Sequence, residues 1–136
     1  MNIYRTINAQ AERLYSQYKE HGNIIIAYDF DDTVYGHNGN NCDDIIRVLR
    51  CCKQANIGRF ICYTASKEER YPFIEQYCKD MNLPLDKIND GFDDVNHVNG
   101  GKIYYNIFLD DKAGLGQALE TLQIVLNRII DNTDAF

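Results

Sequence analysis

Side chains that can bind metal or phosphate recur in this sequence where apolar segments end. They are Asp29, Asp31, Asp32 and Thr33 after a first apolar run, Thr64 and Ser66 after a second, and Lys102, Asp110, Asp111 and Lys112 around a third. Carboxylates gathered in one place repel each other unless a cation lies between them. Oxygen ligands suit Mg²⁺, which takes one or two carboxylates, keeps several waters and also binds substrate phosphate. The pattern therefore predicts a Mg²⁺ cofactor.

These residue types can divide the work of phosphoryl transfer. A carboxylate held in line with a phosphorus atom can form an aspartyl-phosphate, and Asp29 stands directly after an apolar run. Asp31, two residues further on, can protonate the leaving oxygen and then activate water. Phosphoryl oxygens need donors and positive charge, so we expect Thr33, Thr64 and Lys102 to bind the substrate. Thr64 and Lys102 are also counted as catalytic.

The hydrophobic pattern alternates between helix and strand along the chain. Helical spacing covers residues 5–20, 43–55, 66–81 and 115–130, and short strand patterns cover 24–30, 59–64, 87–89 and 105–109. Ser66 and Glu69 have the form of a capping box, which predicts that the third helix begins at Ser66. Such alternation predicts an α/β fold, with a parallel sheet and helices on both faces. Ligands bind such sheets beyond the carboxyl ends of the strands.

Length and composition indicate what kind of protein carries these residues. The 136 residues predict one three-layer domain over 1–136. The net charge of −6 argues against non-specific nucleic-acid binding, so a nucleic acid is expected only as a substrate. The longest apolar run, Ile24–Tyr28, is too short to span a membrane, and no signal region precedes it. Five cysteines without a Cys-x-x-Cys pair predict core residues of a reduced, cytoplasmic protein.

Four segments together resemble the haloacid dehalogenase (HAD) superfamily. Asp29-Phe30-Asp31-Asp32-Thr33 after an apolar strand resembles its first motif, Asp-x-Asp-x-Thr. Ile61-Cys62-Tyr63-Thr64 resembles the second motif, and Lys102 matches the lysine of the third. Ile107-Phe108-Leu109-Asp110-Asp111 resembles the fourth, an apolar strand ending in an acidic pair. The resemblance covers about residues 22–130, with the four motifs in the family's order.

The resemblance implies a role for each matching residue. Asp29 would be the nucleophile, Asp31 the general acid and base, and Thr64 and Lys102 would hold the phosphoryl group. The metal would be held by Asp29, the backbone carbonyl of Asp31, Asp110, and Asp111 directly or through water. Family members that cleave carbon–halogen bonds lack the second Asp of the first motif and need no metal. The presence of Asp31 therefore favours phosphatase chemistry.

The intervals between motifs leave no room for the cap domains that usually set substrate choice in this family. Thirty residues separate Thr33 from Thr64, and 37 separate Thr64 from Lys102. We therefore expect an open site, which suits a nucleotide, a sugar phosphate or a nucleic-acid end. A small substrate would also fit if a second copy of the chain enclosed the site, so a homo-oligomer is compatible with this prediction.

The sequence therefore predicts a Mg²⁺-dependent phosphomonoesterase. The same residues also allow other interpretations. Acidic clusters also occur in turns, and no role is assigned to Asp32, His37 or Lys112. A phospho-accepting receiver domain uses similar residue types, but in a different order along the chain. A third reading is a binding protein that keeps the fold without the activity.

Overall fold

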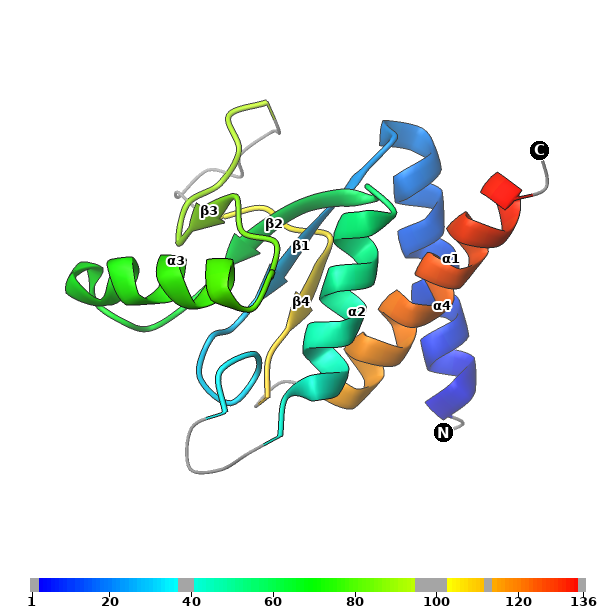
Figure 1. Ribbon diagram of the computed structural model, residues 1–136. Coiled ribbons are helices and arrows are strands. Elements are labelled where there is room, and N and C mark those ends of the chain that lie inside the picture. Colours follow the sequence, from blue (N-terminus) through cyan, green and yellow to red (C-terminus); the bar gives the residue numbers. More distant parts are fainter. Residues whose placement is uncertain (1–2, 37–40, 95–102, 112–113, 135–136) are drawn as a thin grey trace.

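The computed structural model describes residues 3–36, 41–94, 103–111 and 114–134. Figure 1 shows the elements in chain order. They are α1 (Ile3–His21), β1 (Ile24–Tyr28), α2 (Asp43–Gln54), β2 (Gly58–Cys62), the 3₁₀ turn η2 (Glu68–Arg70), α3 (Tyr71–Asp80), β3 (Lys87–Ile88), β4 (Ile107–Leu109) and α4 (Leu115–Asp134). Each predicted helix and strand is therefore present, with its ends shifted by a few residues.

The strands form one parallel sheet in the order β3-β2-β1-β4. All five residues of β1 are buried, as expected of a central strand covered on both faces. Its register pairs Tyr28 with Cys62 of β2 and with Leu109 of β4. The carboxyl ends of β1, β2 and β4 therefore lie level at one edge, which is where the predicted site residues follow.

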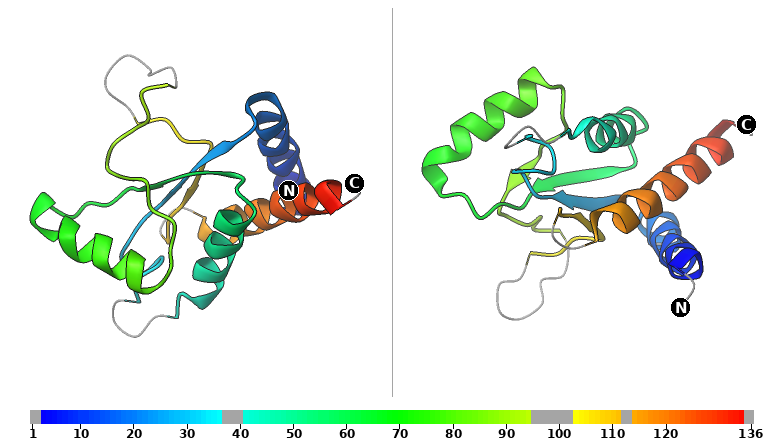
Figure 2. Two further views of the ribbon diagram at one scale, coloured as in Figure 1. Left: turned by 45° about the horizontal axis from the view of Figure 1, so that its top comes forward. Right: turned by 90° about the horizontal axis from the view of Figure 1, so that it is seen from below.

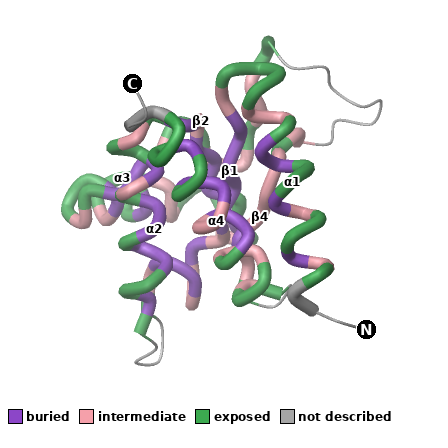
Figure 3. The backbone as a smooth tube through the Cα atoms, turned by 90° about the vertical axis from the view of Figure 1, so that its right-hand side faces the viewer, coloured by how far each residue is buried: buried purple, intermediate pink, exposed green. Residues whose placement is uncertain are grey.

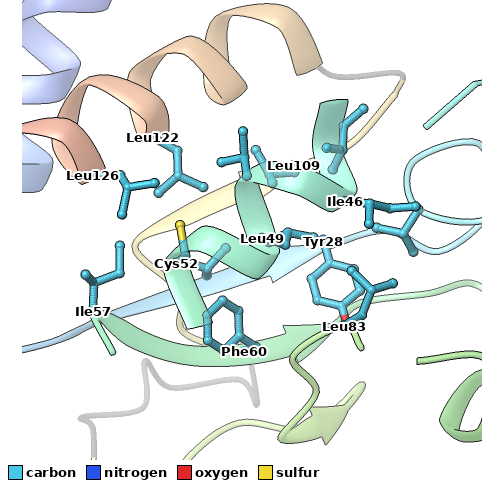
Figure 4. Packing of buried hydrophobic residues seen from close by; sticks show 14 of the residues in the cluster. Tyr28, Ile46, Leu49, Cys52, Ile57, Phe60, Leu83, Leu109, Leu122 and Leu126 are labelled. Atoms are coloured by element: carbon cyan, nitrogen blue, oxygen red, sulfur yellow. The ribbon is translucent and has the colours of Figure 1, made fainter. Parts of the chain in front are cut away.

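Helices lie on both sides of this sheet, as the sequence predicts. Helices α2 and α3 cover one side, α1 lies on the other, and α4 packs along β4 and against α1 (Figures 2 and 3). Leu49 and Cys52 of α2, Leu122 and Leu126 of α4 and Tyr28 of β1 belong to the main core (Figure 4). The α/β class and its three layers are confirmed.

The second face of the sheet is covered in part by the connection between β3 and β4. Ile25, Ala27 and Ile61 form a small cluster on this face, and Phe92 and Tyr104 are among the partly buried residues that pack against it. The described residues of the connection therefore cover apolar surface that a helix usually covers in a sheet of this kind.

Strand β4 begins later than the pattern over 105–109 predicts. The side-chain oxygen of Asn106 accepts a hydrogen bond from the Ile25 amide at 2.7 Å, and the Asn106 amide donates to the Ile25 carbonyl at 2.8 Å. An amide side chain thus replaces one backbone bond of the ladder, so regular pairing starts at Ile107.

The capping box predicted at Ser66 and Glu69 is wrong. The chain first makes the 3₁₀ turn η2, and Lys67 at its start makes no side-chain capping bond. The Ser66 hydroxyl instead accepts hydrogen bonds from Thr64 and Arg70. Pro72 lies in the first turn of α3, where its missing amide leaves no intrahelical bond unmade.

All five cysteines are free thiols, and Cys42, Cys52, Cys62 and Cys78 are buried. Burial raises the pKa of the Cys52 thiol to about 12, which keeps it protonated and unreactive. The cysteines are therefore core residues, as predicted. In the described part of the chain, no helix combines the length and the apolar character that crossing a membrane requires.

Gly58 is required by the close pairing of β1 and β2. A Cβ atom at this position would lie 2.1 Å from the Ile24 carbonyl oxygen, which belongs to the backbone and cannot rotate away. We expect Gly58→Ala to lower the free energy of unfolding by more than about 2 kcal/mol, measured by denaturant titration.

Gly116→Ala is the matched control. It lies in α4, where an added Cβ meets nothing within 4 Å, so it should stabilise by up to about 1 kcal/mol. Equal stability of the two variants would contradict this account of the β1–β2 contact.

Candidate active site

Three carboxylates meet where β1 and β4 end. The Asp29 amide donates to the Leu109 carbonyl at 2.9 Å, which continues the β1–β4 pairing by one residue. Asp110 and Asp111 follow Leu109 directly and so stand beside Asp29. Each of the three residues offers a carboxylate oxygen, and these oxygens all lie within 4.8 Å of one another. This spacing suits a hard cation bound by oxygen ligands.

The electrostatics of Asp29 follow from this grouping. Burial raises the pKa of Asp29 to about 6, a hydrogen bond from the Phe30 amide opposes the rise, and the charges of Asp110, Asp111 and Asp31 add to it. Negative charge is therefore concentrated at this edge of the sheet, and a bound cation would relieve it.

The segment after Asp29 turns sharply. The Phe30 carbonyl accepts the amides of Val34 at 3.1 Å and Tyr35 at 3.0 Å. The Asp32 amide donates to the Tyr35 carbonyl at 2.8 Å, and Asp32 has a φ of +61°, a conformation that Asp tolerates better than most residues. Asp32 therefore helps to form the turn through its backbone conformation and its amide hydrogen bond.

Thr33 was predicted to contact substrate, but it is not exposed to solvent. Its side chain is fully buried, and its hydroxyl oxygen accepts a hydrogen bond from the Asp111 amide at 3.2 Å. The substrate-binding prediction for Thr33 is replaced by a structural role, because the residue ties the turn after β1 to the acidic pair after β4.

Thr64 is held on both its backbone and its side chain. Its amide donates to Asn89 Oδ1 at 2.7 Å, and its carbonyl accepts from Asn89 Nδ2 at 2.7 Å. Its hydroxyl donates to Ser66 Oγ at 3.1 Å and accepts from the Ser66 amide at 3.1 Å. The Tyr63 amide donates to the Tyr28 carbonyl, so Thr64, two residues after the end of β2, lies near the end of β1.

Arg70 is a site residue that sequence reasoning missed. Its Nη1 donates to Asp31 Oδ2 at 2.6 Å, and its Nη2 donates to Asp31 Oδ1 at 2.9 Å. The bidentate pair raises the pKa of Arg70, chiefly through the hydrogen bond to Asp31. The segment from Ser66 to Glu69 was interpreted as a helix start, and only the 3₁₀ turn brings the next residue back toward β1.

The structure brings together Asp29, Asp110 and Asp111. Arg70 links Asp31 to Ser66, and Ser66 in turn bonds to Thr64. Lys102, the predicted phosphoryl-binding lysine, lies outside the described residues, as do His37 and Lys112. A groove of about 860 Å³ lies elsewhere, beside β3, and none of the predicted site residues lines it. Its walls carry Lys53, Lys79, Glu75 and Asp90, which are charges of mixed sign.

The comparisons with known proteins support the fold alone. No protein-family model matches the sequence, and no curated protein matches it. Among solved structures, a conserved protein from Bacteroides thetaiotaomicron is similar with a TM-score of 0.59 and 20% sequence identity. The match covers 81% of this chain and 92% of that one. Both are parallel-sheet α/β proteins of the Rossmann-like kind.

Asp29→Asn should change how stability depends on pH. The pKa of Asp29 is about 6 in the folded chain, above its ordinary value of 3.8, so the folded chain holds this proton more tightly than the unfolded chain does. The resulting stabilisation is present below about pH 4 and is lost as the pH rises to about 6. Metal-free wild type should lose on the order of 1 kcal/mol relative to Asp29→Asn between about pH 4 and pH 7.

Denaturant titrations of both proteins with a chelator would measure this difference. Taking the difference between the two proteins cancels the carboxylates far from Asp29, which titrate alike in both, and leaves Asp29 with its interactions with Asp31, Asp110 and Asp111. A stability difference that is the same at the two pH values would refute the assigned environment of Asp29.

Thr33→Val should expose the Asp111 amide to exchange, because valine fills the same space and has no acceptor. Thr33→Ser keeps the hydroxyl and is the control. We expect hydrogen exchange at the Asp111 amide to be at least about tenfold faster in Thr33→Val than in Thr33→Ser, as seen by NMR. Equal exchange rates would show that the hydrogen bond does not hold this segment.

Proposed function

We propose that the chain is a Mg²⁺-dependent phosphomonoesterase of the HAD-like superfamily. The observation that carries the proposal is the group formed by Asp29, Asp110 and Asp111 at the ends of two adjacent parallel strands. The sequence motifs predict these same three residues as metal ligands. Thr64, predicted for the phosphoryl group, follows the strand on the other side of β1.

The donor set fits the cation. Asp29, Asp110 and Asp111 would hold it through carboxylate oxygens, and Asp31 through its backbone carbonyl. When bound, Mg²⁺ supplies positive charge that neutralises the phosphoryl oxygens. The hydrogen bond from the Phe30 amide fixes one oxygen of Asp29, which leaves the other for attack on phosphorus.

Asp31 and Thr64 complete the proposed reaction. Asp31 would give a proton to the leaving oxygen and then accept one from the water that hydrolyses the aspartyl-phosphate. Thr64 and Lys102 would bind the oxygens of the transferred group. Thr33 would act through Asp111, whose amide it holds.

The substrate would be a phosphate monoester such as a nucleotide, a sugar phosphate or a nucleic-acid end. The short intervals between the motifs support an open site that admits such molecules. The five free thiols support a reducing, cytoplasmic compartment.

The test is Mg²⁺-dependent release of phosphate from an aryl phosphate and from a panel of natural monoesters. Wild type should turn over, and Asp29→Asn should lose at least about 10³-fold in kcat because its amide cannot attack phosphorus. Asp80→Asn, on the exposed end of α3, is the matched control and should be active.

Absence of turnover across the panel, with wild type folded and Mg²⁺ present, would contradict the proposal. A long-lived phospho-Asp29 without turnover would instead favour a receiver-like signalling domain. Mg²⁺ binding without any phosphorylation would favour a binding protein.

A further inference from the structure

Arg70 is a fixed cation beside the group proposed to protonate the leaving oxygen. Its guanidinium lies over Phe30 at 5.2 Å, Phe73 at 5.7 Å and Tyr35 at 5.9 Å from the ring centroids. Its backbone amide donates to the Lys67 carbonyl at 3.0 Å, within the turn η2. The aromatic rings and the turn together hold the guanidinium in one place, so little conformational entropy remains to be lost when it binds an anion.

The hydrogen bonds of Arg70 leave part of the guanidinium available. Arginine has five N–H donors. Three of them go to Asp31 Oδ2, Asp31 Oδ1 and Ser66 Oγ. The other two, on Nε and Nη2, have no acceptor among the described residues, and a third of the side chain is exposed to solvent. A further anion can therefore bind Arg70 from outside.

Arg70 lies on the side of the site where the leaving group would be. Asp31, its partner, is the proposed acid that contacts the leaving oxygen, and Ser66 connects Arg70 to Thr64 of the phosphoryl site. A leaving group with a second anionic group would bring that charge close to the guanidinium. Because the surrounding carboxylates repel such a group, a fixed cation is needed to bind it.

We propose that Arg70 selects phosphate monoesters whose leaving group carries a second anionic group, either a phosphate or a carboxylate. This inference rests on the proposed function and names its substrate class. The anion takes the two remaining donors of Arg70, on Nε and Nη2, while Asp31 and Ser66 keep the other three. Arg70 would thus be a specificity-determining residue, beyond any role in positioning Asp31.

Two substrate pairs test this proposal and separate the two anions. Adenosine 3′,5′-bisphosphate against adenosine 5′-monophosphate adds a phosphate, and 2-phosphoglycerate against glycerol 2-phosphate adds a carboxylate. Wild type should prefer the doubly anionic member of at least one pair by roughly 10- to 100-fold in kcat/KM, mainly through KM. The pair that shows the preference identifies the anion.

Variants of Arg70 decide whether the residue causes the preference. Arg70→Gln should reduce it to about twofold or less, and Arg70→Lys should keep part of it, because lysine has the charge without the fork. Arg128→Gln is the control, since Arg128 pairs with Glu12 on the exposed α1–α4 surface. If Arg70 only positions Asp31, Arg70→Gln lowers both members of a pair equally, and that result overturns the proposal.

A binding measurement separates failure of this proposal from failure of the proposed function. Asp29→Asn with Mg²⁺ should bind adenosine 3′,5′-bisphosphate or 2-phosphoglycerate in calorimetry. Adding Arg70→Gln should weaken that binding by about tenfold or more. If wild type releases no phosphate but this loss is seen, the phosphatase proposal fails and Arg70 still selects the anion. If Arg70→Gln binds both members of each pair as tightly as its parent does, the selection proposal fails.

Discussion

The parallel pairing of β1 with β4 is the contact on which the candidate site depends. It places Asp29 beside Asp110 and Asp111, which are about 80 residues away along the chain. The same pairing brings three carboxylates together, and the charges of Asp110 and Asp111 add to the rise that burial causes in the pKa of Asp29. Buried apolar residues such as Tyr28 and Leu109 must therefore hold the two strands together against this repulsion.

Much of this arrangement could be predicted from the sequence because strong patterns encode it. The run Ile24–Tyr28 is apolar throughout, so it had to be a strand covered on both faces, and its end fixed the place of Asp29. The third apolar run, Ile107–Leu109, likewise fixed the place of Asp110 and Asp111. Parallel strands place such ends at one edge, so the grouping required no knowledge of side-chain geometry.

The interactions that sequence reasoning missed depend on local turns. One 3₁₀ turn decides whether Ser66 caps a helix or bonds with Thr64. The spacing of hydrophobic residues does not predict such a turn. Arg70 reaches Asp31 only because of that turn. Thr33 was expected to face the substrate, but the turn after Asp29 buries it toward the Asp111 amide. Burial and hydrogen-bond partners of single polar residues depend on such turns more than on hydrophobic spacing.

The shortness of β4 has a consequence for how the fold and the site depend on each other. β4 has three residues and pairs only with β1 within the described sheet, so opening it breaks few hydrogen bonds. The two carboxylates that follow it therefore belong to a segment that can separate from the sheet more cheaply than β1 or β2 can. A cation that joined Asp110 and Asp111 to Asp29 would hold β4 against β1. Its binding energy would then also be folding energy for β4 and for α4, which packs against it.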